Sequence, residues 1–394
     1  MNGSSKLWTA QFVAIILMAF LFFCCLQLLT AGFPAFVSHV NHNPAQAGMM
    51  TTAFMISAII TRPFVGGIIH KANIKKVNIA SLIFLAVTIA LSYHQKSVSL
   101  LLFLRILHGI AFGIVSTIIS TMATTVIPVR RLGEGIGYYG MATSVGTSLA
   151  PMFALSLIQF FSFNALLLLA VLLVIVTLLL NIFIRSPHSN RMRTKEVSFI
   201  EYAFDKKAFS PCLLASFFTI TLGGVVSFLG ELGKEVQLGG SVSLFFLIIA
   251  VTMAIVRPLS GRIFDSKGHK VILYPAIVSG IIGLCLLAAT QDIWTLLLAG
   301  VFYGIAYGTI TPTLQALAVS FVSKEKQGTA NAMFFSFMDL GMAIGSISLG
   351  VLASYTGYRL MYGYSIVCLV VLLVTYIFLF LRHKRAVNAM DKVS

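Results

Sequence analysis

The residues of this sequence that could do chemistry are few, and they stand inside long apolar stretches. Asp339 is the one carboxylate near the middle of such a stretch, because Glu134 and Glu231 stand near the ends of theirs. Hydrocarbon favours the neutral form of a carboxylic acid and a nearby cation favours the charged form, so such a group can take up and release a proton as its surroundings change. Asp339 is therefore the candidate for proton coupling. The alternative is a structural ion pair with a cation such as Arg105.

Arg105 and His108 are three residues apart, a spacing that places both on one face of a helix. Arginine binds carboxylate or phosphate groups through two parallel hydrogen bonds, so this face predicts recognition of an anion or of a proton-linked group. Packing is the alternative. Tyr303 and Tyr307, four residues apart in one apolar stretch, and Gln27 near the amino terminus are further candidates for contact with a substrate. The candidate substrate-binding residues are Arg105, His108, Gln27, Tyr303 and Tyr307.

The elements that position these residues must be membrane-spanning helices. The chain has 394 residues, of which 58% are hydrophobic and 10% charged, and its mean hydropathy is +0.98. Soluble domains carry about a quarter of their residues as charged side chains, whereas a membrane-spanning helix needs about 20 apolar residues. Hydropathy predicts twelve such helices, at residues 7–31, 48–69, 77–93, 98–122, 135–160, 163–184, 209–230, 241–264, 271–290, 293–317, 329–352 and 361–382.

The remaining segments are too short for a soluble catalytic or nucleic-acid-binding domain, so we expect no enzymatic activity and no nucleic-acid partner. The five cysteines lie inside apolar runs without metal-ligand spacing, and we expect no metal or other cofactor. The chain lacks the glycine-rich loop of ATP-driven pumps.

The basic residues predict the orientation of the chain. With the amino terminus in the cytoplasm, 23 of the 27 lysines and arginines fall on or near the cytoplasmic side, as retained positive charges do. The net charge of +16 is then a property of topology and of anionic lipid contact. We expect a multi-pass protein of the cell membrane, with both termini cytoplasmic, acting as a monomer.

The sequence repeats itself at an offset of 195 residues. The segment from Arg62 to Val77 then meets the segment from Arg257 to Ile272, and GIAFG at 109–113 meets GIAYG at 304–308. Matches at one offset in several helix pairs predict two parallel six-helix halves. We expect an amino-terminal bundle at 1–184, a cytoplasmic linker at 185–208 and a carboxy-terminal bundle at 209–394.

At these residues the sequence resembles the major facilitator superfamily over its whole length. Its loop after the second helix is similar to the signature Gly-x-Leu-Ala-Asp-Arg-x-Gly-Arg-Lys: the first copy reads GGIIHKANIKK with His70 at the acidic position, and the second reads GRIFDSKGHK with Asp265 retained. Helix five is similar to the antiporter motif. The resemblance implies an all-α fold of twelve helices and a gating role for Arg62, Gly66, Arg257, Gly261, Asp265, Lys270, Gly146 and Pro151.

The resemblance implies a secondary transporter whose partners are a small-molecule substrate, protons and the lipid bilayer. The antiporter motif favours export in exchange for protons, and the arginine and histidine on one helix favour an anionic or zwitterionic cargo. The chain is also similar to exporters of opine-type metallophores. A multidrug efflux pump and a proton-coupled uptake symporter are the alternatives.

Overall fold

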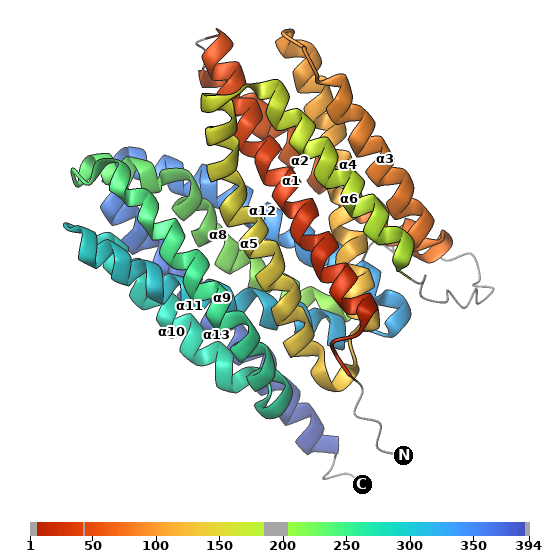
Figure 1. Cartoon of the computed structure of the whole chain (residues 1–394). Helices are drawn as coiled ribbons and strands as arrows, with labels where there is room; N and C mark the ends of the chain where they lie inside the picture. Colours follow the sequence, from red (N-terminus) through yellow and green to blue (C-terminus); the bar gives the residue numbers. More distant parts are fainter. Residues whose placement is uncertain (1–5, 42–43, 185–203, 391–394) are drawn as a thin grey trace. The chain divides into compact units, whose positions relative to one another are not determined.

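The computed structural model describes residues 6–41, 44–184 and 204–390, and the regular elements in that part of the chain are all helical (Figure 1). Twelve long α-helices follow one another in the described residues. They are α1 (Ala10–Asn41), α2 (Pro44–Lys71), α3 (Ile74–Leu91), α4 (Val98–Val126), α5 (Leu132–Phe160), α6 (Phe163–Phe183), α8 (Lys206–Glu235), α9 (Leu244–Lys267), α10 (His269–Ala289), α11 (Ile293–Ser320), α12 (Gln327–Thr356) and α13 (Tyr358–Met390). The predicted all-α fold class is confirmed.

Short caps and turns separate the helices. Asn73 accepts a hydrogen bond from the backbone N–H of Lys76 at the start of α3, and Ser162 does the same for Ala165 at the start of α6. α9 ends at Gly268, whose φ of 79° is in the left-handed region that glycine adopts without strain. Three 3₁₀ turns stand at other junctions of the described residues: η1 (Val129–Arg131), η2 (Gly239–Ser243) and η3 (Lys324–Lys326).

The helices group into two compact units. The first unit contains residues Met1–Asp205 together with Val319–Ser336, and the second contains Lys206–Ala318 together with Phe337–Ser394. The first part of α12 therefore belongs to the first unit. The proposed linker falls largely on residues 185–203, which lie outside the described residues, and the division into bundles at 1–184 and 209–394 stays a prediction.

Asn331 holds the first part of α12 in the first unit. Its amide oxygen accepts a hydrogen bond from the Ser120 hydroxyl at 3.0 Å, and its amide nitrogen donates to Thr124 at 3.2 Å. The Asn331 side chain is fully buried. A fully buried amide needs such partners on both its oxygen and its nitrogen, and both partners come from α4.

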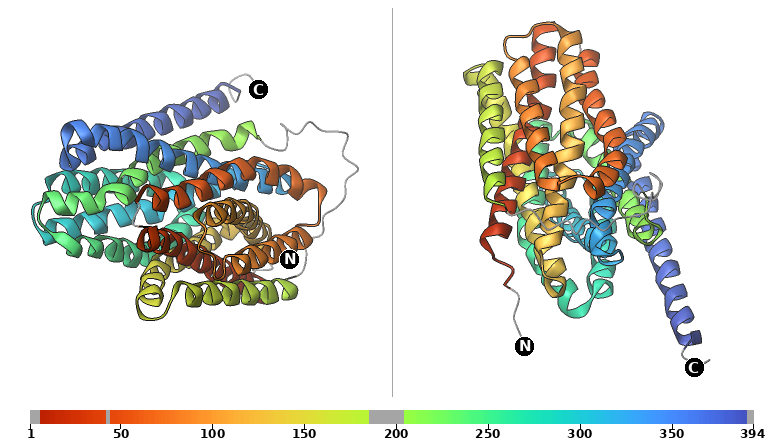
Figure 2. Two further views of the ribbon diagram at one scale, coloured as in Figure 1. Left: turned by 90° about the horizontal axis from the view of Figure 1, so that it is seen from above. Right: turned by 90° about the vertical axis from the view of Figure 1, so that its right-hand side faces the viewer.

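The helices of the first unit run side by side (Figure 2), and glycines let two pairs of backbones approach closely. A Cβ at Gly113 of α4 would stand 3.0 Å from the carbonyl oxygen of Ala58 in α2, and one at Gly146 of α5 would stand 2.7 Å from that of Phe20 in α1. Small residues at helix interfaces are typical of membrane proteins, where van der Waals packing replaces the hydrophobic effect between helices. The second unit shows the same use of glycine at Gly308, where a Cβ would stand 3.3 Å from Met253 Cα.

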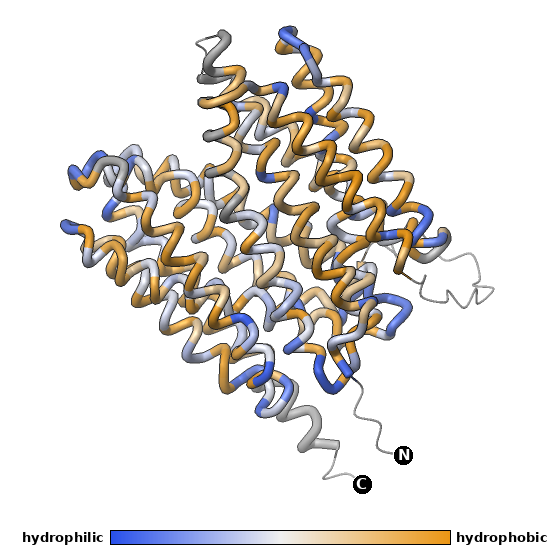
Figure 3. Tube along the Cα trace, viewed as in Figure 1, coloured by the Kyte–Doolittle hydropathy of each residue, from blue (hydrophilic) through white to orange (hydrophobic). Residues whose placement is uncertain are grey.

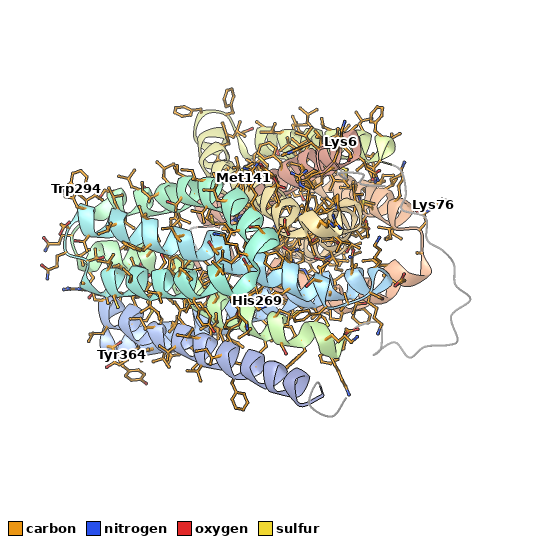
Figure 4. The ribbon with its side chains drawn as sticks, turned by 90° about the horizontal axis from the view of Figure 1, so that it is seen from below. Lys6, Lys76, Met141, His269, Trp294 and Tyr364 are labelled. Atoms are coloured by element: carbon orange, nitrogen blue, oxygen red, sulfur yellow. The ribbon has the colours of Figure 1, made fainter. Side chains whose placement is uncertain are left out.

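The surface of the helices fits a bilayer. Eleven helices within the described residues have the length and apolar composition of a membrane span, and α5, with 29 residues, is the twelfth long helix. Apolar residues follow the helices and hydrophilic ones gather near their ends (Figure 3). Trp294 and Tyr364 lie at the margin of the second unit (Figure 4) and are 77% and 53% exposed. Such exposed amphipathic rings are typical of membrane–water interfaces.

Candidate functional site

Arg105 on α4 is enclosed by aromatic rings in the first unit. Its side chain is fully buried, and its Nε donates a hydrogen bond to the Met50 carbonyl oxygen of α2 at 3.2 Å. The guanidinium carbon lies 4.3 Å from the centroid of the Phe54 ring and 5.1 Å from that of Phe33. Cation–π contacts at these distances stabilise a desolvated guanidinium by about 2 kcal/mol or more.

Close packing of α2 on α4 produces this arrangement. Gly109 follows Arg105 by one helical turn, and a Cβ there would overlap Ser57 Oγ and the Phe54 carbonyl oxygen. Because glycine leaves this space empty, the α2 backbone lies directly on α4. The ring of Phe54 then covers Arg105.

Several polar atoms of this site have no hydrogen-bond partner among the described residues. They are both terminal nitrogens of Arg105, both ring nitrogens of His108 and the hydroxyl oxygen of Thr30. The backbone of Thr88 is near enough to His108 to interact electrostatically, but the ring forms no hydrogen bond of ordinary geometry. Phe33 of α1 lies beside Thr30, Arg105 and His108. Its ring lies 5.5 Å from that of His108 and packs on Arg105, and Thr30 precedes it by one turn of α1.

Buried polar atoms are nearly always hydrogen-bonded in folded proteins. We name Thr30, Arg105 and His108, with the rings of Phe33 and Phe54, the Arg105 site. Five unsatisfied atoms in one such group are unusual for a purely structural cluster. The Arg105 site therefore has the unused hydrogen-bonding capacity that a ligand-binding site requires.

The charge of Arg105 has no counterpart in the first 184 residues. Glu134 is the single acidic residue in that stretch, and it stands in the first turn of α5 with its Oε2 2.6 Å from Arg131 Nη2. Asp205, another acid of the first unit, has its Oδ2 3.1 Å from Lys326 Nζ. A desolvated cation without a counter-ion costs several kcal/mol, so an anion from outside residues 1–184 is the group that fits Arg105.

The second unit has a different set of polar residues. Tyr303 of α11 is fully buried, and its hydroxyl lies 2.8 Å from the hydroxyl of Thr221 in α8. Tyr307, one turn further along α11, keeps accessible surface. The Arg257 guanidinium carbon of α9 lies 5.6 Å from the Tyr307 ring centroid, and Asp339 of α12 is close enough to act electrostatically on the Tyr307 phenol.

The predicted site residues fall into these groups. Arg105 and His108 come together in the first unit, and Tyr303, Tyr307, Arg257 and Asp339 come together in the second. Gln27 keeps accessible surface on α1. The substrate-binding and proton-coupling roles stay predictions. Tyr303, Arg105 and His108 are all fully buried, and the Tyr303 hydroxyl is already hydrogen-bonded to Thr221.

The predicted gating residues differ in their surroundings. Arg62 is buried, with its guanidinium carbon 5.1 Å from the Phe112 ring centroid and 5.2 Å from that of Phe335. Gly66 and Gly261 are buried, Asp265 is half-buried, and Lys270 is exposed. The side chains of His70 and Pro151 lie outside the described residues. The gating role of the set stays a prediction.

Sequence reasoning missed the aromatic partners of the site. Phe33 and Phe54 enclose Arg105, and Thr221 binds Tyr303, but each stands in an apolar stretch with nothing local to mark it. The offset of 195 residues does carry a signal, because it pairs Phe112 with Tyr307 and Phe23 with Phe218. Within the described part of the chain, no group of three or more histidine, cysteine or acidic side chains could hold a metal ion.

Long apolar helices, a buried Arg105 without an ion-pair partner among the described residues, and a sequence repeat at half the length of the chain are together typical of a membrane transporter. The family model described as Major Facilitator Superfamily matches residues 15–291 and 268–391. The chain belongs to the Major Facilitator Superfamily.

Curated relatives and solved structures agree with this family. The chain is 22% identical over 358 residues to multidrug resistance protein 2 of Bacillus subtilis, covering 86% of this chain and 88% of that protein. It is 24% identical over 324 residues to the multidrug resistance protein MdtG of Citrobacter koseri, covering 79% of each. The human organic anion transporter MFSD10 superposes with a TM-score of 0.82 at 16% identity, over 93% of this chain and 98% of that one. The E. coli fucose:proton symporter gives 0.76 at 18% identity, over 95% and 99%.

Proposed function

We propose that this protein is a secondary active transporter that exports an anionic or zwitterionic small molecule across the cell membrane, in exchange for protons and by alternating access. The observation that carries the proposal is the Arg105 site, where a buried guanidinium has two terminal nitrogens without partners and residues 1–184 supply no carboxylate for it. A carboxylate or phosphate of the cargo satisfies both nitrogens and neutralises the charge. Gln27, Tyr303 and Tyr307 are the further proposed substrate contacts.

The proton enters the proposal through Asp339. It is the acidic residue near the middle of a membrane-spanning helix, and it shares its surroundings with Tyr307 and Arg257. The proposed orientation, with both termini in the cytoplasm, follows from the distribution of lysine and arginine. Export is supported by the antiporter-like segment of α5, whose Gly146 allows the α5 backbone to approach α1.

An opine-type metallophore is one cargo of the proposed chemistry, because it combines several carboxylates with amines. The human structural neighbour is an organic anion transporter, which is in keeping with an anionic cargo at Arg105. The names of the two bacterial relatives favour a different cargo, amphipathic drugs, and multidrug efflux is the second candidate function.

Transport into inverted membrane vesicles separates the two cargo classes. We expect Arg105→Ala to lower proton-driven uptake of an opine by at least about ten-fold, because a hydrogen bond to a charged group contributes about 1.5–3 kcal/mol. Uptake of ethidium, a lipophilic cation, stays the same. Arg359→Ala is the matched control, since Arg359 Nε also donates to a backbone carbonyl oxygen at 3.2 Å, that of Ala288. Equal losses for the two cargoes in Arg105→Ala count against anion recognition.

Metabolite profiling of a deletion strain, under metal starvation and in rich medium, identifies the natural cargo. Export predicts that the cargo accumulates in the cytoplasm and disappears from the medium. The opposite distribution indicates the uptake symporter instead.

A further inference from the structure

The two sequence repeats form the same contact in their respective units. In the first unit Arg62 of α2 lies over the ring of Phe112 in α4, and Phe23 of α1 meets that ring at 6.0 Å between centroids. In the second unit Arg257 of α9 lies over the ring of Tyr307 in α11, and Phe218 of α8 meets it at 5.7 Å. Each residue of one group stands 195 positions from its counterpart, so the contact is duplicated along with the sequence.

At the centre of this contact the repeats differ by one oxygen atom. Phe112 has none, whereas Tyr307 has a hydroxyl, and the same packing around Phe112 shows that the hydroxyl is not required for it. The Tyr307 hydroxyl has no hydrogen-bond partner among the described residues, and the side chain keeps accessible surface. Tyr303, by contrast, is fully buried and its hydroxyl is bonded to Thr221. Placing a polar group inside a membrane protein costs free energy unless the group is hydrogen-bonded, so polar groups kept there are generally functional.

A carboxylate accompanies the hydroxyl. Tyr307 is acted on electrostatically by Asp339 and by Arg257, and the counterpart of Asp339 in the first repeat is Ser144. The second repeat thus has a phenol hydroxyl at Tyr307 and a carboxylate at Asp339, and the first repeat has neither group at the two corresponding positions, Phe112 and Ser144.

Few other titratable groups lie near Tyr307 in the part of the chain that the structure describes. α9 contributes Arg257 and α11 contributes Tyr303, whereas the α8 residues that reach the two tyrosines, Phe218 and Thr221, carry no charge. Tyr362 and Cys368 of α13 act electrostatically with Tyr303. Asp339 is the acidic group among them.

We propose that Tyr307 is a positioning residue for proton coupling at Asp339, an inference that rests on the proposed function. During transport the Tyr307 hydroxyl, which has no hydrogen-bond partner among the described residues, turns to donate a hydrogen bond to the ionised Asp339 carboxylate, and its ring keeps Arg257 beside the pair. When Asp339 takes up a proton, its carboxyl group becomes neutral, and the Tyr307 hydroxyl leaves it and hydrogen-bonds to water instead. Tyr307 stays neutral throughout, so the proton passes only to and from Asp339.

The test compares pH profiles of proton-driven transport by the full-length protein in vesicles, with an opine as the transported probe. Tyr307→Phe removes the oxygen and reproduces the Phe112 arrangement of the first unit, so the variant is expected to fold. Without the hydrogen bond the ionised carboxylate is less stable, and the midpoint of the acidic limb moves upward by about one pH unit, which corresponds to about 1.4 kcal/mol.

Tyr362→Phe is the matched control, because Tyr362 is a buried tyrosine of the same unit whose hydroxyl donates to the Gly224 carbonyl oxygen at 3.4 Å. Its pH profile is expected to equal that of the wild type. If Tyr307→Phe also keeps the wild-type midpoint while Asp339→Asn abolishes pH-driven transport, the role of Tyr307 is refuted and the proposed function stands. If Asp339→Asn leaves pH-driven transport unchanged, proton coupling at Asp339 is wrong and the role of Tyr307 falls with it.

Discussion

Replacing Gly146 with alanine tests the contact between α1 and α5. A Cβ at this position would stand 2.7 Å from the Phe20 carbonyl oxygen and 3.2 Å from the Cys24 backbone nitrogen. Both are backbone atoms, so no side chain can rotate away to make room. The helices must instead separate by about 0.7 Å to reach an ordinary contact distance of 3.4 Å.

The magnitude follows from two opposed effects. Overpacking of this kind costs about 1–3 kcal/mol, whereas alanine in place of glycine inside a helix stabilises by about 1 kcal/mol. Gly230 of α8 provides a control that isolates the first effect, because a Cβ there meets nothing within 4 Å. The propensity gain is common to both variants and cancels. We therefore expect Gly146→Ala to be less stable than Gly230→Ala by about 1–3 kcal/mol.

Tryptophan fluorescence during thermal unfolding in detergent measures this difference where it arises. Trp8 lies 4.6 Å from the ring of Tyr138 in α5, measured between centroids. Replacing the other tryptophan, Trp294, with phenylalanine makes Trp8 the sole reporter. Unfolding of the whole chain of 394 residues in one transition, to which both substitutions contribute, gives about 1 °C per kcal/mol, so Gly146→Ala unfolds at least about 1 °C below Gly230→Ala. Equal midpoints for the two variants mean that the close approach of α1 and α5 is not as described, and the reasoning fails.

Two further predictions concern side-chain hydrogen bonds. Thr221→Val leaves the buried Tyr303 hydroxyl without its partner at 2.8 Å, so we expect it to lower the free energy of unfolding by about 1–3 kcal/mol. Thr221→Ser keeps the hydroxyl and is expected to have no such effect. Chemical denaturation of both variants in detergent measures the difference, and equal losses of stability contradict the prediction. Asp292, at the start of α11, accepts hydrogen bonds from the backbone N–H and the hydroxyl of Thr295, and these bonds hold its pKa below the usual value. They stabilise the folded protein fully above the usual aspartate pKa, and this stabilisation is lost as the pH falls through the lower pKa of the folded protein. The unfolding midpoints of wild type and Asp292→Ala should therefore differ at neutral pH and converge in strong acid, and a difference independent of pH excludes the cap.

Much of the fold can be predicted from sequence because membrane helices are specified by local hydropathy. The twelve predicted helices correspond to the twelve long helices of the described residues, although α1 continues to Asn41, ten residues past its predicted end at residue 31. Hydropathy detects the apolar part of a helix, whereas backbone hydrogen bonding continues past Pro34 without regard to the bilayer. A proline inside a helix removes one bond without ending it.

Contacts between distant residues could not be predicted in the same way. Asn331 binds Ser120 and Thr124 across more than 200 residues, and no local pattern indicates that the first part of α12 belongs with residues 1–205. The enclosure of Arg105 by Phe33 and Phe54 is of the same kind. The repeat that pairs Arg62 with Arg257 also places Phe112 opposite Tyr307, within GIAFG and GIAYG, but it does not indicate that each of these rings lies beside the arginine of its own unit.

The internal repeat separates residues that maintain the architecture from residues that are free to differ. Gly109 packs on Phe54, and a Cβ at Gly304, 195 residues later, would stand 3.2 Å from the Cα of Ile249, the counterpart of Phe54. Gly113 and Gly308 likewise pack on Ala58 and Met253, which are counterparts of each other. Both repeats therefore keep the same close contacts between their helices, and residues shared in this way need no explanation beyond packing.

The charges deep in the membrane-spanning helices sort differently. Arg62 and Arg257 are shared, as the glycines are, and each lies over an aromatic ring of its own unit. Arg105 and Asp339 are not shared, because their counterparts are Gly300 and Ser144. An uncharged residue evidently suffices at each of these positions for the packing of a bundle, so the cost of placing a charge there calls for a role outside packing. One unshared cation in the first repeat and one unshared acid in the second fit the proposed carrier of anions and protons. The charges that the repeats do not share are therefore the ones to which transport chemistry is assigned.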